Sequence, residues 1–345
     1  MAVVGHWASL AEAEKLTQSM MLKGIIQTVI EGGQLVPRMP VKQVNGKDLV
    51  YNREKSWTAS DGAEFVDIRE QITWNSDADL DQITTPLKRV ARQDALDNFV
   101  ADTYTNINDY RATMIQQLVK RATRFVEDKL IYGDVTYGSA KEFDGLHAMA
   151  EENTGNLDID EGEGALALSN LRLLLTAMKI HTLGKDNVIL LVPSQIADRI
   201  DAGYAEGGLV RSGVTHHMLQ ASSMLGEAGQ EITMFRGVPI VRSDFLVAEQ
   251  ANTGVGSDIR AKNTSGTEMF TIFGIRFGQT EDGGVALLFG GAGRDVGEVF
   301  KRTSFPVLED YDSGGERVVS YLAPTLGAQH SLGRIYDITD AEVTP

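Results

Sequence analysis

Apolar residues recur at helical spacing in several stretches of the chain. The first begins at a Ser9-Leu10-Ala11-Glu12 capping box and continues to Gly32-Gly33, which predicts a helical N-terminal arm. The second runs from Asp97 to Ile131 without glycine or proline and stops at Gly133. It predicts one long helix that acts as a strut, with an apolar stripe made of Ile107, Tyr110, Met114, Leu118, Ala122, Phe125 and Val126.

Between Val41 and Gln93 the pattern changes to short alternating stretches among charged residues, with a turn at Val44-Asn45-Gly46-Lys47. This predicts a long two-stranded excursion that has too few apolar residues for a core of its own. An isolated hairpin is only marginally stable in water, so we expect the excursion to be ordered mainly by lying on another surface.

The C-terminal two thirds predict an α/β layer followed by antiparallel strands. Residues 133–156 are loop-like, residues 158–163 form an acidic turn, and a helix is expected over 167–180. A buried strand over 184–192 precedes a helix from Pro193-Ser194 to Ile200. Further strands are expected, with a turn at Asp312-Ser313-Gly314-Gly315, over residues 231–235, 239–241, 269–277, 285–289, 299–307, 317–322 and 332–338.

Length, composition and charge limit the kinds of function that this protein can have. A chain of 345 residues can form one large or two medium domains, and it has no cysteine for disulfides, thiolate metal sites or thiol nucleophiles. No apolar run approaches the roughly 20 residues that a membrane-spanning helix needs, and the N-terminus does not read as a signal peptide, so we expect a cytoplasmic product. The net charge of -16 opposes a sequence-independent grip on nucleic acid.

Each motif that could indicate catalysis or ligand binding was compared with a purely structural interpretation. The glycines from Gly291 to Gly297 have GxGxxxG spacing, one residue too long for a dinucleotide fingerprint, and are expected to form a turn. Gly184-Lys185-Asp186 is expected to cap a helix, His216-His217 cannot chelate from one face, and the acidic turn lacks the closing glutamate of a Ca²⁺ loop. We therefore predict no catalytic, cofactor-binding or metal-binding residues, although 48 acidic residues leave carboxylate pairs open.

The order of parts resembles the major capsid proteins of tailed bacteriophages, which have the HK97-like fold. Two segments of the sequence strengthen this resemblance. The segment from Phe125 to Asp134, followed by Phe143-Asp144-Gly145-Leu146, looks like the end of that family's spine helix and the loop after it. The segment from Phe235 to Asp244 resembles its G-x-P-[VI]-V strand.

The resemblance implies an α+β fold with the family's parts in order. Residues 1–40 would form the N-terminal arm, 41–93 the E-loop, 94–134 the spine helix of the P domain, 135–295 the A domain, 296–327 the P-domain β-strands and 328–345 the closing strand of the A domain with the C-terminus. It further implies self-assembly into pentamers and hexamers of an icosahedral shell, built in the host cytoplasm around double-stranded DNA and without a membrane.

Two departures shape the expected partners. The arm starts within ten residues of Met1, which implies a separate scaffolding protein, beside a portal and an optional decoration protein. The last asparagine is Asn263, so the lysine–asparagine crosslink of some family members is not available in its usual form. The candidate intersubunit contacts are instead ordinary charged residues, namely Lys47, Arg53, Lys55, Glu64, Glu309, Asp310 and Arg317.

Two alternatives stay open. An encapsulin nanocompartment shares the fold and holds cargo enzymes, and a neighbouring terminase or portal gene would distinguish the viral protein from it. A soluble α/β enzyme would elute as a small oligomer, whereas a capsid protein would elute as particles or as pentamers and hexamers.

Overall fold

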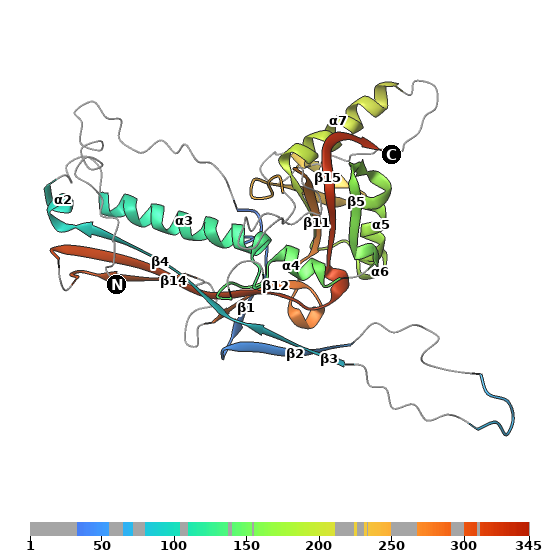
Figure 1. Cartoon of the computed structure of the whole chain (residues 1–345), viewed down its shortest axis with the longest axis horizontal. Helices are drawn as coiled ribbons and strands as arrows, with labels where there is room; N and C mark the ends of the chain where they lie inside the picture. The colour runs from blue at the N-terminus through green and yellow to red at the C-terminus, as the bar shows by residue number, and fades with distance from the viewer. Residues whose placement is uncertain are drawn as a thin grey trace.

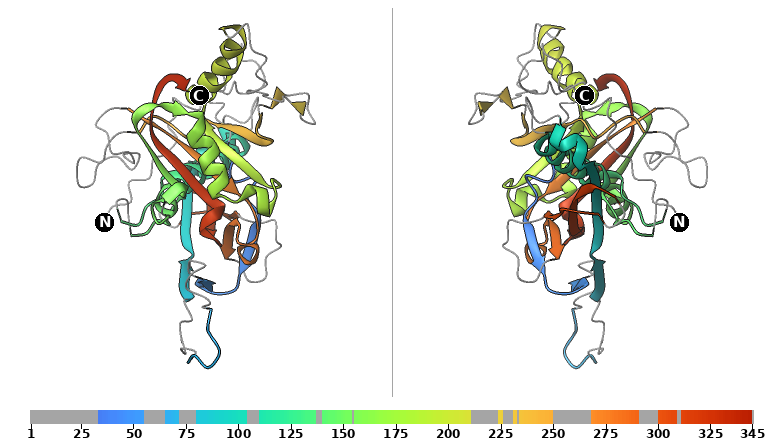
Figure 2. Two further views of the ribbon diagram at one scale, coloured as in Figure 1. Left: turned by 90° about the vertical axis from the view of Figure 1, so that its right-hand side faces the viewer. Right: turned by 90° about the vertical axis from the view of Figure 1, so that its left-hand side faces the viewer.

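Two β-sheet modules and a projecting hairpin make up the molecule (Figure 1). An elongated module with a long helix lies on one side, a second module stands across its end, and the hairpin extends away below both (Figures 1 and 2). The computed structural model describes residues 33–54, 65–71, 80–103, 110–136, 140–153, 155–210, 224–225, 231–232, 234–249, 268–290, 300–308 and 311–344.

The elongated module contains a five-stranded sheet built around β14 (Ser313–Leu326). Its antiparallel neighbours are β4 (Lys88–Asp97) on one side and β13 (Lys301–Phe305) and β12 (Val285–Gly290) on the other. The short strand β1 (Val41–Val44) joins β12 in parallel. The sheet therefore combines segments from both ends of the described chain.

One face of this sheet is covered by α3 (Tyr110–Tyr132), and the short helix α2 (Asn98–Thr103) follows β4. Leu118, Ala122, Val126 and Leu130 recur every fourth residue along α3 and are buried, as an amphipathic helix requires. The helix ends at Tyr132, next to the predicted stop at Gly133.

The upright module is a six-stranded sheet in the order β5-β15-β11-β6-β10-β9. These strands are β5 (Asp158–Ala167), β15 (Leu332–Thr344), β11 (Phe270–Arg276), β6 (Val188–Pro193), β10 (Val238–Ser243) and β9 (Met234–Phe235). Helices α5 (Leu168–Ala177) and α7 (Ser194–Val210) pack against this sheet, and α4 (Leu146–Glu151) and α6 (Ile180–Leu183) are short. The remaining elements are β7 (Met224–Leu225), β8 (Glu231–Ile232) and the 3-10 turns Gly155–Leu157, Thr280–Asp282 and Gln329–Ser331.

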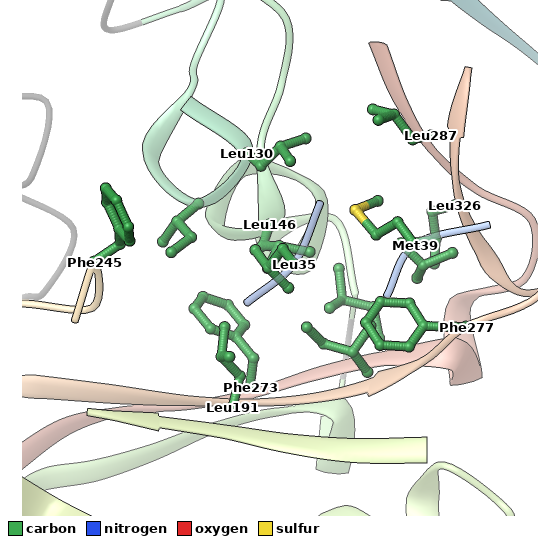
Figure 3. Packing of buried hydrophobic residues seen from close by; sticks show 14 of the residues in the cluster. Leu35, Met39, Leu130, Leu146, Leu191, Phe245, Phe273, Phe277, Leu287 and Leu326 are labelled. Carbon is green, nitrogen blue, oxygen red and sulfur yellow. The ribbon is translucent and has the colours of Figure 1, made fainter. Parts of the chain in front are cut away.

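Both faces of β6 are buried, which explains its uninterrupted apolar sequence. Leu190 and its alternate neighbours pack in the cluster beneath α5 and α7, whereas Ile189 and Leu191 pack in a second cluster with the end of α3 and with α4. This second cluster also contains Leu287 of β12 and Leu326 of β14, and it forms the joint between the two modules (Figure 3).

Two glycines explain the motif after the long helix. A Cβ at Gly145 would lie 2.7 Å from the Leu130 carbonyl oxygen, and one at Gly133 would lie 2.6 Å from the Phe143 carbonyl oxygen. The Gly145 N–H donates to the Gly133 carbonyl at 2.8 Å. Because backbone meets backbone here, only glycine fits at either position.

Several sequence predictions need correction. Phe125, expected in the buried stripe, is 48% exposed. Residues 146–151 form α4 rather than loop, and the expected acidic turn at 158–163 is the start of β5, where pairing with β15 outweighs the charge. The turn expected at 312–315 is wrong, since Ser313 to Gly315 lie in β14 opposite β4, and Leu308 forms an antiparallel bridge with Tyr311.

Other predicted elements differ in pairing or in extent, or lie outside the described residues. The Val44–Lys47 turn links β1 and β2 without pairing them, because β1 joins the five-stranded sheet. Likewise, β4 and β12 lie in this sheet although the sequence placed them in the segments 41–93 and 135–295. The expected helix over 97–131 contains α2 and α3, with residues 104–109 outside the described part. The helix of residues 9–32, the glycines from Gly291 and the His216-His217 pair also lie outside it.

Candidate assembly surfaces

The hairpin of β2 (Asp48–Glu54) and β3 (Leu80–Pro86) leaves the body with little to pack on. Its side chains alternate between half-buried and exposed, and no position in either strand is fully buried. Its base is fixed by Tyr51, whose hydroxyl donates to the Leu326 carbonyl at 2.6 Å, and by the Leu87 N–H, which donates to the Lys47 carbonyl at 2.9 Å. The hairpin is thus anchored at one end only.

Residues 65–71 lie beyond the end of β2 and β3, far from both modules (Figure 1). Phe65 is fully exposed and Ile68 is 90% exposed, with Asp67 and Glu70 beside them. The Glu70 N–H closes a turn on the Asp67 carbonyl, and Arg69 has a φ of 75° at its third position, where type II turns need a positive value. Large apolar side chains held in water on a projecting turn are typical of an interaction site.

The sheet face opposite α3 is basic and partly aromatic. Arg317 on β14 lies between Gln93 of β4 and Thr303 of β13, and the same face carries Arg89, Lys301, Phe305 and Tyr321. Its strand positions 89–95, 301–305 and 315–321 carry no acidic side chain on that face. The Arg317 guanidinium stacks 4.8 Å above the Phe305 ring and donates to the Gln93 side chain at 3.1 Å.

The face toward α3 instead holds a buried carboxylate. Glu316 accepts hydrogen bonds from Arg302 and Arg111 at 3.0 Å and from Ser304 at 2.9 Å. Burial alone would raise the pKa of Glu316, but these hydrogen bonds and the charge of Arg302 outweigh it and hold the pKa below its usual range. The N-terminal half of α3 is therefore fastened to β13 and β14 by charge.

A second buried polar cluster lies at the joint between the modules. Glu249 accepts hydrogen bonds from Tyr132 at 3.1 Å and Thr271 at 2.7 Å, and its Oε1 lies 2.9 Å from His147 Nε2. The Arg334 Nη1 lies 3.4 Å from His147 Nδ1. Arg334 can only donate, so Nδ1 of His147 faces a donor while Nε2 faces the Glu249 carboxylate. His147 and Glu249 are shut off from solvent, so the pair holds elements together and meets no substrate.

An open hollow of about 410 Å³ lies between α3 and residues 244–247. Arg121, Arg124, Phe125 and Asp128 line it from α3, and Asp244, Phe245 and Val247 line it from the other side. Its charges are of both signs. In the part of the chain that the structure describes, no cluster of His, Asp or Glu could hold a metal ion, and no helix is long and apolar enough to cross a membrane.

The predicted contact residues are spread over these surfaces. Lys47 is exposed in the loop before β2, Arg53 is half-buried in β2 opposite Asp81, and Arg317 lies on the basic face. Lys55, Glu64, Glu309 and Asp310 lie outside the described residues. Sequence reasoning missed Arg89, Lys301 and Tyr321, whose common face follows from strand alternation only once the register of β4, β13 and β14 is known.

Neither a protein-family model nor a curated protein sequence matches the chain. Several solved structures match the chain. The SrpI encapsulin of Synechococcus elongatus PCC 7942 matches with a TM-score of 0.62 at 14% identity, over 98% of both chains. The capsid of the cyanophage P-SCSP1u matches with a TM-score of 0.54 at 12% identity over 94% of this chain and 93% of that one, and the capsid of an empty GTA particle matches with 0.55 at 14% identity over 92% and 99%.

The chain has the HK97-like capsid fold. Identities this low carry the fold alone, but matches over nearly the whole of both chains mean that the arrangement of modules is shared and not only one motif. The three matched structures are those of one encapsulin and two capsids.

Proposed function

We propose that this chain is a major capsid protein, which self-assembles into pentamers and hexamers of an icosahedral virion shell around packaged viral DNA. The observation that carries the proposal is the projecting hairpin, whose described strands hold no fully buried position and beyond which Phe65 and Ile68 are exposed. The chain shares its fold with shell proteins, and in a shell such a hairpin would lie on the neighbouring copy.

The parts of the subunit take roles by this analogy. The β2–β3 hairpin serves as the E-loop, α3 as the spine helix, the five-stranded sheet as the P domain and the six-stranded sheet as the A domain. Residues 1–40 serve as the N-terminal arm. A scaffolding protein, a portal and a decoration protein are the expected partners of the shell, and assembly takes place in the host cytoplasm.

Charge complementarity supports contact between the hairpin and a second copy. Between Asp48 and Asp81 the sequence has nine acidic and three basic residues, whereas the sheet face around Arg317 is basic. Opposite charge steers encounter and sets register, and it selects against wrong partners. The contact candidates Lys47, Arg53, Lys55, Glu64, Glu309, Asp310 and Arg317 would each contribute about 0 to 1 kcal/mol, repeated at every copy of the lattice.

An encapsulin nanocompartment is the second candidate. The observation that favours it is the match to the SrpI encapsulin, whose TM-score of 0.62 exceeds those of the cyanophage and GTA capsids. The two candidates predict the same subunit contacts and differ in what the shell encloses.

The test is electron microscopy of the purified protein, expressed alone and together with its neighbouring genes. Closed icosahedral shells or capsomer rings are the expected result, and a uniform small oligomer that never forms shells, even with a scaffold supplied, would reject the shell function. Nuclease-protected DNA in shells made with the neighbouring genes would support the virion, whereas a co-purifying enzyme and no protected DNA would support the encapsulin.

A further inference from the structure

The chain enters the described structure through a short strap, residues 33–40, that is held by one carboxylate of the long helix. The N–H groups of Gln34 and Leu35 both donate to Glu127 Oε1 at 2.5 Å, and the N–H of Val36 donates to Oε2 at 3.1 Å. Glu127 is completely buried. A buried carboxylate is costly unless hydrogen bonds satisfy it, and here three successive backbone groups from a distant segment do so.

The same strap inserts into the joint between the modules. Leu35 and Met39 are buried in the joint cluster, and the N–H groups of Arg38 and Met39 both donate to the Leu35 carbonyl, at 3.0 and 2.9 Å. Figure 3 shows Leu35 beside Leu146, with Phe273 on the other side. The chain then continues into β1, which pairs with β12. The strap is thus bound to α3 through Glu127 and to the joint between the modules through Leu35 and Met39.

We propose that Glu127 is a latch, which fixes the exit of the N-terminal arm to α3 and so couples the arm to the joint between the modules. The proposal rests on the proposed shell function, in which the arm reaches a neighbouring copy. With the latch closed, residues 34–36 are held on α3 at one place relative to both sheets. With the latch open, the subunit stays folded while this attachment of the strap is lost.

Gly33 supports the assignment independently of the hydrogen bonds. A Cβ at this position would lie 2.8 Å from Glu127 Oε2 and 3.0 Å from its Cδ. Since the carboxylate is held by three donors, it cannot move aside without breaking them. Gly33→Ala should therefore open the latch from the strap side while leaving Glu127 in place.

The first experiment measures the latch in the full-length subunit. Glu127→Gln keeps the side-chain size but replaces one acceptor oxygen by a donor, and we expect amide exchange at Gln34, Leu35 and Val36 to become at least about tenfold faster. Trypsin should also cut faster after Arg38, which lies in the strap, because release of the strap frees the backbone around this residue. Glu152→Gln, at an exposed glutamate beyond α4, is the matched control and should leave both rates unchanged.

Gly33→Ala guards against a folding artefact, because it should raise the same two rates while Glu127 itself stays a glutamate. Exchange in the core strands β6 and β11 should stay as slow as in the wild type for both variants. Wild-type rates at the strap in both variants would overturn the latch, and faster exchange throughout the protein would show that Glu127 serves global stability instead.

Assembly then tests the coupling. Both variants should give shells of mixed size or open sheets under conditions where the wild type gives uniform shells. Normal shells from a variant with a released strap would overturn the coupling. If the wild type itself forms no shells, the proposed function fails, while the exchange and proteolysis results still decide on the latch.

Discussion

The exposed apolar tip of the hairpin gives the sharpest test of how subunits join. In the variant Phe65→Ala with Ile68→Ser, two side chains that touch nothing in their own subunit are removed. Burying a Phe or Ile side chain contributes about 1.5–3 kcal/mol, and fixing each in an interface costs about 0.5–1.5 kcal/mol. The pair therefore contributes a net of about 2–3 kcal/mol per hairpin, which corresponds to a roughly 30- to 150-fold weaker contact.

Two measurements separate assembly from folding. The concentration at which shells appear, followed by light scattering and electron microscopy, should rise by at least this factor, whereas the circular dichroism melting temperature of the unassembled subunit should not change. Leu173→Ala, at a partly exposed position of α5, removes apolar surface outside the hairpin and should leave the concentration at which shells appear as it is. Assembly of the tip variant at the wild-type concentration would refute the reasoning.

Three further predictions concern the buried groups. The pKa of Glu316 is held down in the folded protein. Its contribution to stability is therefore present above the unfolded pKa of about 4.3 and is lost as the pH falls through the folded pKa. In urea denaturation, Glu316→Gln should lower the free energy of unfolding by about 1–2 kcal/mol at pH 7 and should have no effect once Glu316 is protonated. An equal cost at every pH would contradict this. Gly145→Ala should destabilise by about 3 kcal/mol or more, because its Cβ meets the backbone of α3. Gly155→Ala should cost less in the same denaturation series, because Gly155 has a positive φ of 68° but nothing lies near its Cβ. Glu249→Gln should cost about 1–3 kcal/mol in thermal denaturation, since one amide oxygen cannot satisfy the donors from Tyr132, His147 and Thr271, and an unchanged melting curve would show that the cluster is not needed.

Local patterns were enough to predict most elements of this chain. The four-residue spacing of Leu118, Ala122 and Val126 predicted the buried side of α3, and the unbroken apolar run of β6 predicted a strand covered on both faces. Phe125 was misplaced because it lies beside the buried stripe of Leu118, Ala122 and Val126, where it lines an open hollow, and a helical period cannot show how wide the covered face is.

The long-range pairings could not be predicted in this way. The segments 158–163 and 313–315 were mistaken for turns because acidic residues and glycines usually mark them, whereas pairing with β15 and β4 makes them strands. Lys47, Arg53 and Arg317 were chosen by charge, but nothing in the sequence showed that Arg89 and Lys301 share a face with Arg317. Glu127 was equally hidden, because its partners are backbone groups about 90 residues away.

The positions of β14 and β15 in the sequence have a consequence for synthesis of the chain. β14 is the central strand of one sheet, and β15 lies between β5 and β11 in the other, yet every described strand that pairs with them precedes them in the sequence. Neither sheet can therefore be completed on the ribosome before these two strands are made, and the apolar strands beside them lack these partners until then.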